Sequence, residues 1–166
     1  MKKSGAGAGV WITNIETSHS QGHAFRLNFK CTNNMAEYEA LILGLQIIIK
    51  LGGQRIMVMG DSELVIKQIN AEYFFHNPRL ARYKDTTKDL VEDLLESKFA
   101  IIPRKHNLQA HCLATFSSTC KLPFSPIQKY TTEIKHRPIV PDNVKYWQIL
   151  SEDEQIYHFL NNEGEF

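Results

Sequence analysis

Hydrophobic residues at 25–29 alternate with polar ones, as they do in a half-buried β-strand. Phe25, Leu27 and Phe29 lie at every second position, so they share one face. They belong to the second of two short runs, 7–15 and 23–30, which a polar stretch separates. The pattern predicts two antiparallel strands joined as a hairpin.

After the hairpin the period changes from two residues to three or four. Thr32, Asn33 and Asn34 offer helix N-caps, and apolar residues then recur at helical spacing until Gly52 and Gly53. The short apolar run 55–59 predicts a strand buried on both faces, as in a parallel sheet. The other expected elements are helices at 62–70, 80–97 and 107–120 and a strand at 99–102.

The predicted order is β-β-α-β-α-α-β-α, which is typical of one mixed α/β domain spanning 1–120. The composition then changes. Four prolines fall within 121–141, and 151–166 contains five acidic residues with no Lys or Arg. We therefore expect 121–166 to be a linker and an acidic tail, with a short amphipathic piece around 147–160.

Composition narrows the class of protein only slightly. The chain has 166 residues, 43% of them hydrophobic, which excludes a collagen-like or wholly disordered protein. Residues 1–120 carry 14 Lys and Arg against 11 Asp and Glu, so the body permits a polyanionic partner. Three cysteines without a CxxC pair predict reduced thiols, and no apolar run is long enough to span a bilayer. We expect a soluble intracellular protein; its compartment and oligomeric state stay open.

Two acidic residues lie where a strand or hairpin leads into a helix. Glu37 follows Asn34 at the spacing of a capping box, and Asp61 precedes Ser62 at a good N-cap position. Both can therefore be purely structural. Acids at the carboxyl ends of adjacent strands can also converge on a ligand, and this second interpretation points to a metal site.

Three segments, in order along the chain, resemble the motifs of type 1 ribonuclease H domains. They read T-N-N-M-A-E-Y-E-A-L at 32–41, G-D-S-E-L-V at 60–65 and P-R-K-H-N-L-Q-A-H-C-L-A at 103–114. The resemblance covers 5–120 and is closest to the domains of plant LTR-retrotransposon polyproteins. The segment P-I-V-P-D-N at 138–143 is similar to sequence downstream of that domain.

This resemblance implies a ribonuclease H-like mixed sheet of five strands with helices on both faces. It also implies hydrolysis of the RNA strand of an RNA–DNA hybrid by two Mg²⁺ ions, one activating water and one stabilising the leaving oxygen. Four carboxylates hold these ions in the family, because Mg²⁺ prefers oxygen ligands. Glu37 and Asp61 match the second and third of the four.

The other two carboxylates have no counterpart here. The first belongs to the family's first strand, but 5–10 already matches the second strand and no acid precedes Glu16, so that central strand is predicted to be missing. The fourth position holds His111, and no acid lies between Glu96 and Glu133. An imidazole is a poor Mg²⁺ ligand, so we expect weak or absent Mg²⁺ binding and impaired cleavage.

The expected partner is an RNA–DNA hybrid or another nucleic acid, with no membrane. By resemblance, Asn33 and Asn34 contact the nucleic-acid backbone, although capping would equally explain them. Glu63 lies where the family usually has Gln, and we expect this anion to weaken binding. A basic cluster that suits phosphate contact or simple solvation surrounds the last predicted strand: Lys98, Arg104, Lys105 and His106. A non-catalytic binding module and an inactive retroelement remnant are the alternative functions.

Overall fold

The structure is a computed structural model that describes residues 5–71, 77–119 and 130–141. Its elements follow the predicted order and add a strand at the end. They are β1 (Ala6–Asn14), β2 (His19–Leu27), α1 (Asn33–Lys50), β3 (Arg55–Gly60), α2 (Glu63–Ile69), α3 (Pro78–Val91), β4 (Glu96–Ile101), a 3₁₀ turn (Arg104–His106), α4 (Leu108–Thr119) and β5 (Tyr130–Lys135).

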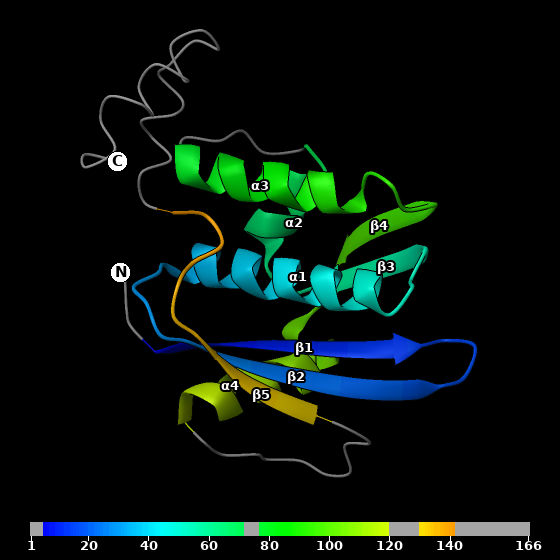
Figure 1. Ribbon diagram of the computed structural model, residues 1–166, viewed down its shortest axis with the longest axis horizontal. Helices are drawn as coiled ribbons and strands as arrows, with labels where there is room; N and C mark the ends of the chain where they lie inside the picture. The colour runs from blue at the N-terminus through cyan, green and yellow to red at the C-terminus, as the bar shows by residue number, and fades with distance from the viewer. Residues whose placement is uncertain (1–4, 72–76, 120–129, 142–166) are drawn as a thin grey trace, which may run out of the picture.

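The predicted hairpin is confirmed, and both of its faces are covered. β1 and β2 pair antiparallel from Ala6 opposite Leu27 to Asn14 opposite His19. Leu27 is buried as the alternation predicts, but Ala24 on the other face is only 1% exposed. Figure 1 shows the reason: α1 lies over one side of the hairpin and α4 lies under the other.

The contact between β1 and α4 depends on a glycine. A Cβ added at Gly9 would lie 2.0 Å from the carbonyl oxygen of Ala110 and 2.5 Å from the backbone nitrogen of Ala114. Backbone atoms at these distances cannot move aside as a flexible side chain would. The absence of a side chain at Gly9 therefore sets how closely α4 approaches the hairpin.

We expect Gly9→Ala to lower the free energy of unfolding by about 2–3 kcal/mol, because α4 must move away from β1. Urea denaturation followed by circular dichroism measures this. Gly60→Ala is the matched control, since its Cβ would meet Ile66 Cδ1 at an ordinary 3.7 Å. Equal stability of the two variants would contradict the close approach.

The helix after the hairpin begins and ends as its sequence predicts. The Thr32 side chain caps α1 by accepting a hydrogen bond from the Met35 backbone N–H at 3.2 Å. Tyr38 and Ile42 are fully buried on its inner face. Gly52 has a φ of +90°, a conformation that favours glycine and that ends the helix.

The described strands form two sheets, with orders β1-β2-β5 and β3-β4. The parallel pairing expected for β3 is confirmed, because it pairs parallel with β4. The expected burial of both its faces is wrong. Ile56 is buried, but Met57 and Met59 on the other face are 53% and 57% exposed. This face of β3 lacks the cover that α1 and α4 provide for the hairpin.

The predicted helix at 80–97 is too long. α3 ends at Val91, and the following residues turn into β4, which begins at Glu96 rather than at Phe99. The Glu96 backbone N–H donates to the Gln54 carbonyl at 3.1 Å, so pairing with β3 determines where the strand starts. Leu95, which continues the helical stripe in the sequence, is 69% exposed.

The expectation that 121–166 is only linker and tail also needs correction. Residues Tyr130–Lys135 form β5, which pairs parallel with β2, and Val140 is 4% exposed within the core. Strand pairing and apolar burial thus continue past the predicted boundary at 120. Residues 120–129 and 142–166, including the amphipathic piece expected at 147–160, lie outside the described part of the chain.

Candidate functional site

Neither candidate acid has the helix-capping role that the sequence allows for it. Thr32, not Asn34, caps α1, so Glu37 does not complete a capping box. The side chain that caps α2 is Ser62, whose Oγ accepts from the Val65 backbone N–H at 3.4 Å, so Asp61 is not the N-cap. Both carboxylates are thus available for another role.

The fold brings these acids together in a cavity of ≈ 70 Å³. Glu37 reaches it from the first turns of α1, Asp61 from the end of β3, and His111 from the first turns of α4. Three elements far apart in the sequence therefore converge there. The full lining is Gly7, Ala8, Gly9, Ala36, Glu37, Ala40, Asp61, Arg104, Asn107, Ala110, His111 and Ala114.

Arg104 supplies the cation of this site. Its Nε donates to Asp61 Oδ2 at 3.2 Å, and the Asp61 side chain is only 11% exposed whereas that of Arg104 is 68% exposed. A largely buried carboxylate is thus held by a guanidinium that is open to solvent. Since solvent screens such a pair, the contact orients Asp61 more than it stabilises the fold.

The pKa of Glu37 is raised above its ordinary value. Desolvation by the surrounding protein is the main cause, although the residue is exposed to solvent at the mouth of the cavity, and the negative charge of Asp61 adds to it. The positive charge of Arg104 acts in the opposite direction. A carboxyl whose pKa is raised by desolvation and by a neighbouring carboxylate is typical of functional sites.

Asp61→Asn is expected to lower the pKa of Glu37 towards 4.5, because it removes the second carboxylate and leaves Arg104 in place. Arg104→Ala is expected to raise that pKa further. Carbon-13 NMR of the Glu37 carboxyl across a pH series measures both shifts. Glu63→Gln serves as the control and should leave the titration of Glu37 unmoved.

The other candidate residues lie around the cavity rather than in it. Glu63 forms an i,i+4 ion pair with Lys67 at 2.8 Å and has 61% of its side chain exposed. Asn33 and Lys105 are exposed, and Asn34 is half-buried at the start of α1. None of these four lines the cavity.

Two parts of the lining are not among the residues selected from the sequence. Asn107, which the Pro103–Ala114 motif contains, accepts a bond from the His111 backbone N–H at 3.0 Å and so helps to begin α4. Gly7, Ala8 and Gly9 of β1 form another wall. Only the alternation of small residues in 5–9 marks these positions in the sequence.

The donor set does not fit two divalent cations. Within the described residues, no group of three or more His, Cys, Asp or Glu side chains is placed to hold a metal ion. Glu37 and Asp61 provide carboxylate oxygens, but Asp61 Oδ2 already accepts a hydrogen bond from Arg104. His111 offers a nitrogen, which Mg²⁺ binds poorly.

A model of the family described as "Reverse transcriptase-like" matches residues 1–117. The chain belongs to this family. It is a ribonuclease H-like domain, as the sequence motifs predict, and is homologous to ribonuclease H1.

Two relatives with similar sequences are longer than this chain. A bifunctional protein of Mycobacterium tuberculosis is 31% identical over 110 residues, which are 66% of this chain and 30% of that protein. Ribonuclease HI of Halobacterium salinarum is 34% identical over 85 residues, or 51% of this chain and 43% of that enzyme. The chain thus spans less than half the length of these relatives.

Solved structures match the ribonuclease H-like fold. RNase H1 from Halobacterium salinarum superposes with a TM-score of 0.60 at 27% identity, over 67% of this chain and 83% of that one. LC11-RNase H1, solved in complex with an RNA/DNA hybrid, gives 0.59 at 27% identity over 70% and 89%. Ribonucleases H generally use divalent metal ions. None of its described helices has the length and apolarity needed to cross a membrane.

Proposed function

We propose that this chain is a nucleic-acid-binding ribonuclease H-type domain in which cleavage of the RNA strand of RNA–DNA hybrids is impaired. The observation that carries the proposal is the cavity in which Glu37 and Asp61 meet His111. Two carboxylates and an imidazole lie where the sequence resemblance implies a set of four carboxylates. The same resemblance supports an origin in a retrotransposon polyprotein.

The division of the described strands into two sheets supports the proposal that the family's central strand, with its carboxylate, has no counterpart among them. The hairpin strand β1 and the parallel strand β3 belong to different sheets. In the family a central strand lies between their counterparts and carries the first catalytic Asp. We propose that a strand outside the described residues is needed to join the two sheets and to complete the carboxylate set.

Substrate binding rests on the surface beside the cavity. Arg104 and Lys105 lie in the short turn next to Asp61, and Asn33 and Asn34 lie at the start of α1. Cations and amides so placed suit contacts to phosphates and to the ribose hydroxyls of an RNA strand. We therefore expect binding of a hybrid without efficient cleavage.

The test measures binding and cleavage on the same chain. Fluorescence anisotropy with a labelled RNA–DNA hybrid should show binding that weakens with salt and that exceeds binding to duplex DNA of the same sequence. Release of labelled RNA in Mg²⁺ should stay near background. Lys105→Ala should weaken binding, whereas Lys88→Ala on α3, remote in sequence from the site, should not.

Each part of the proposal has an outcome that contradicts it. Turnover comparable to that of an intact ribonuclease H1 would show that the carboxylate deficit does not impair catalysis. Equal affinity for the hybrid and for duplex DNA would show that the surface does not recognise an RNA strand.

A further inference from the structure

Residues 130–141 run along the domain as an extended segment that is fastened at both ends. At the first end, β5 pairs parallel with β2, from Tyr130 opposite Gly22 to Lys135 opposite Leu27. The Asn28 backbone N–H extends this pairing by donating to the Lys135 carbonyl at 2.8 Å. In Figure 1, β5 lies on the outer side of β2, at the edge of the three-stranded sheet.

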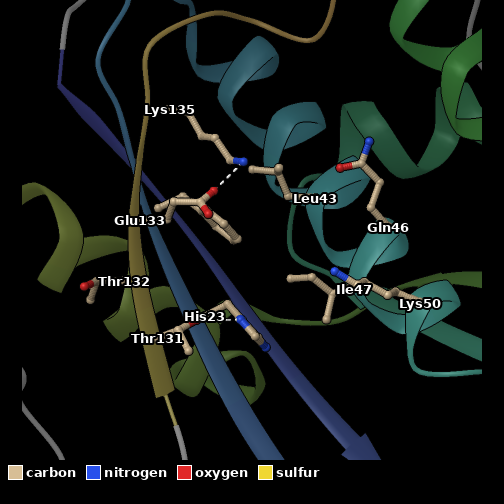
Figure 2. A pocket seen from close by; sticks show the side chains of 10 residues that line it. His23, Leu43, Gln46, Ile47, Lys50, Thr131, Thr132, Glu133 and Lys135 are labelled. Atoms are coloured by element: carbon tan, nitrogen blue, oxygen red, sulfur yellow. Dashed lines mark hydrogen bonds and ion pairs between the residues drawn. The ribbon is translucent and has the colours of Figure 1, made fainter.

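The side chains of β5 contact β2, with a groove between β5 and α1. Thr131 Oγ1 hydrogen-bonds His23 Nδ1 at 2.8 Å, and the ammonium of Lys135 lies 5.8 Å from the centre of the Phe25 ring. Figure 2 shows this groove, of ≈ 360 Å³, with the Glu133–Lys135 ion pair on one wall and α1 on the other. The attachment of β5 therefore depends mainly on the edge of β2.

The second end is held by two charged side chains of the body that bind backbone atoms. Glu39 Oε2 accepts from the Ile139 N–H at 2.7 Å and from the Tyr83 hydroxyl at 2.7 Å. Arg79 donates from Nε and Nη2 to the Val140 carbonyl at 3.1 and 2.7 Å. Glu39 is only 1% exposed, so its carboxylate is a built part of the interior.

This arrangement has the features of peptide recognition by strand addition. A sheet edge supplies the pairing, and the hydrophobic core receives a side chain further along the segment, here Val140 at 4% exposure. A carboxyl group and a guanidinium then bind the N–H and the C=O of adjacent residues, and the guanidinium donates two charge-assisted hydrogen bonds to the same carbonyl oxygen.

We propose that the body of the domain carries a binding site for an extended peptide, formed by the β2 edge with Glu39 and Arg79, and that residues 130–141 are its ligand within the same chain. The site does not depend on the proposed nuclease function. It requires that the segment bind by its own contacts and not only because the chain connects it to α4.

Cutting that connection tests the proposal on the full chain. A protease recognition sequence is placed between residues 120 and 129, a fluorescent label is attached at the C-terminus, and the chain is cleaved after folding. We expect the C-terminal fragment to remain bound at micromolar concentration in size-exclusion chromatography. Anisotropy over a dilution series then gives its Kd.

Two variants test the charged contacts from opposite sides. Arg79→Ala changes the body and Ile139→Pro removes the N–H from the ligand; each should weaken binding roughly ten- to hundredfold, the value of a hydrogen bond to a charged group. Lys88→Ala and Arg137→Ala, on α3 and in the segment, are the matched controls and should leave the Kd unchanged.

Two results would contradict the proposal. Separation of the fragment from the cleaved wild-type chain at micromolar concentration would overturn the proposal. So would equal Kd values for Arg79→Ala and Lys88→Ala. If Arg79→Ala fails to fold, Ile139→Pro reports the same contact from the ligand, with the body unaltered.

Discussion

On the proposed function, supplying the two carboxylates that the ribonuclease H resemblance implies and that have no match in this chain is expected to turn on Mg²⁺-dependent cleavage of the RNA strand of a hybrid. The change has two parts: His111→Asp, and an added N-terminal strand that carries one Asp. With Glu37 and Asp61 these provide four carboxylates around the cavity. Two-metal catalysis stabilises the transition state by several kcal/mol, so the rate should rise about 100-fold or more over the unmodified chain.

The controls separate catalysis from folding. Each change alone leaves three carboxylates and should give little activity. Asp61→Asn in the doubly changed chain should abolish the gain while leaving hybrid affinity in place. A doubly changed chain that folds and binds the hybrid but cleaves no faster than the original would contradict the assignment of Glu37 and Asp61 to the site.

Local signals in the sequence predicted the elements well where a single helix or turn decides the outcome. The helical period after Thr32 and the glycines at 52 and 53 place α1 correctly, since cap and stop lie within the same helix. The three ribonuclease H motifs also identified the family, and residues from all three line one cavity in the structure.

Predictions failed where a distant partner decides the outcome. The helical stripe through Leu95 is real in the sequence, but pairing with β3 ends α3 at Val91. Likewise, 130–135 contains strand-forming Tyr, Thr and Ile residues that the sequence analysis passed over, and the structure pairs this segment with the edge of β2. For Met57 the prediction failed because a partner is lacking: its apolar side chain predicts burial, but no described element covers it.

Glu39 is the clearest residue that sequence reasoning missed. It lies between Glu37 and Ala40 in the segment at 32–41, two residues after the candidate acid, and the resemblance assigns it no role. Its partners, Tyr83 and Ile139, lie 44 and 100 residues away along the chain. A buried carboxylate on an apolar helix face has no local signature, so only the packed structure reveals its role.

Removing the acceptor oxygens at this position is expected to destabilise the domain strongly. Glu39→Leu leaves the Tyr83 hydroxyl and the Ile139 N–H buried without their acceptor. We expect a loss of about 2–4 kcal/mol in the free energy of unfolding, since each unsatisfied buried group costs about 1–3 kcal/mol and removal of the buried charge offsets part of it. Urea denaturation at pH 7 measures the loss.

Glu39→Gln separates the hydrogen bonds from the charge. The amide oxygen can accept both bonds, whereas the buried charge is gone, so this variant should be at least as stable as the wild type at pH 7. Glu16→Gln, which removes an exposed carboxylate from the hairpin loop, is the control and should change stability little. A large loss in Glu39→Gln would show that the ionised carboxylate itself stabilises the fold.

The pH dependence of this difference follows from the pKa of Glu39. Desolvation raises that pKa above 4.5, against the opposing effects of the Tyr83 and Ile139 hydrogen bonds and the positive charges of Arg79 and Lys135. The folded state therefore holds the proton more tightly than the unfolded state. Its contribution to stability is full below about pH 4.5 and is lost as the pH rises through the folded value. The advantage of Glu39→Gln over wild type should thus be largest at neutral pH and shrink on acidification, and an advantage that grows on acidification would mean that the buried carboxylate is stabilised in its charged form.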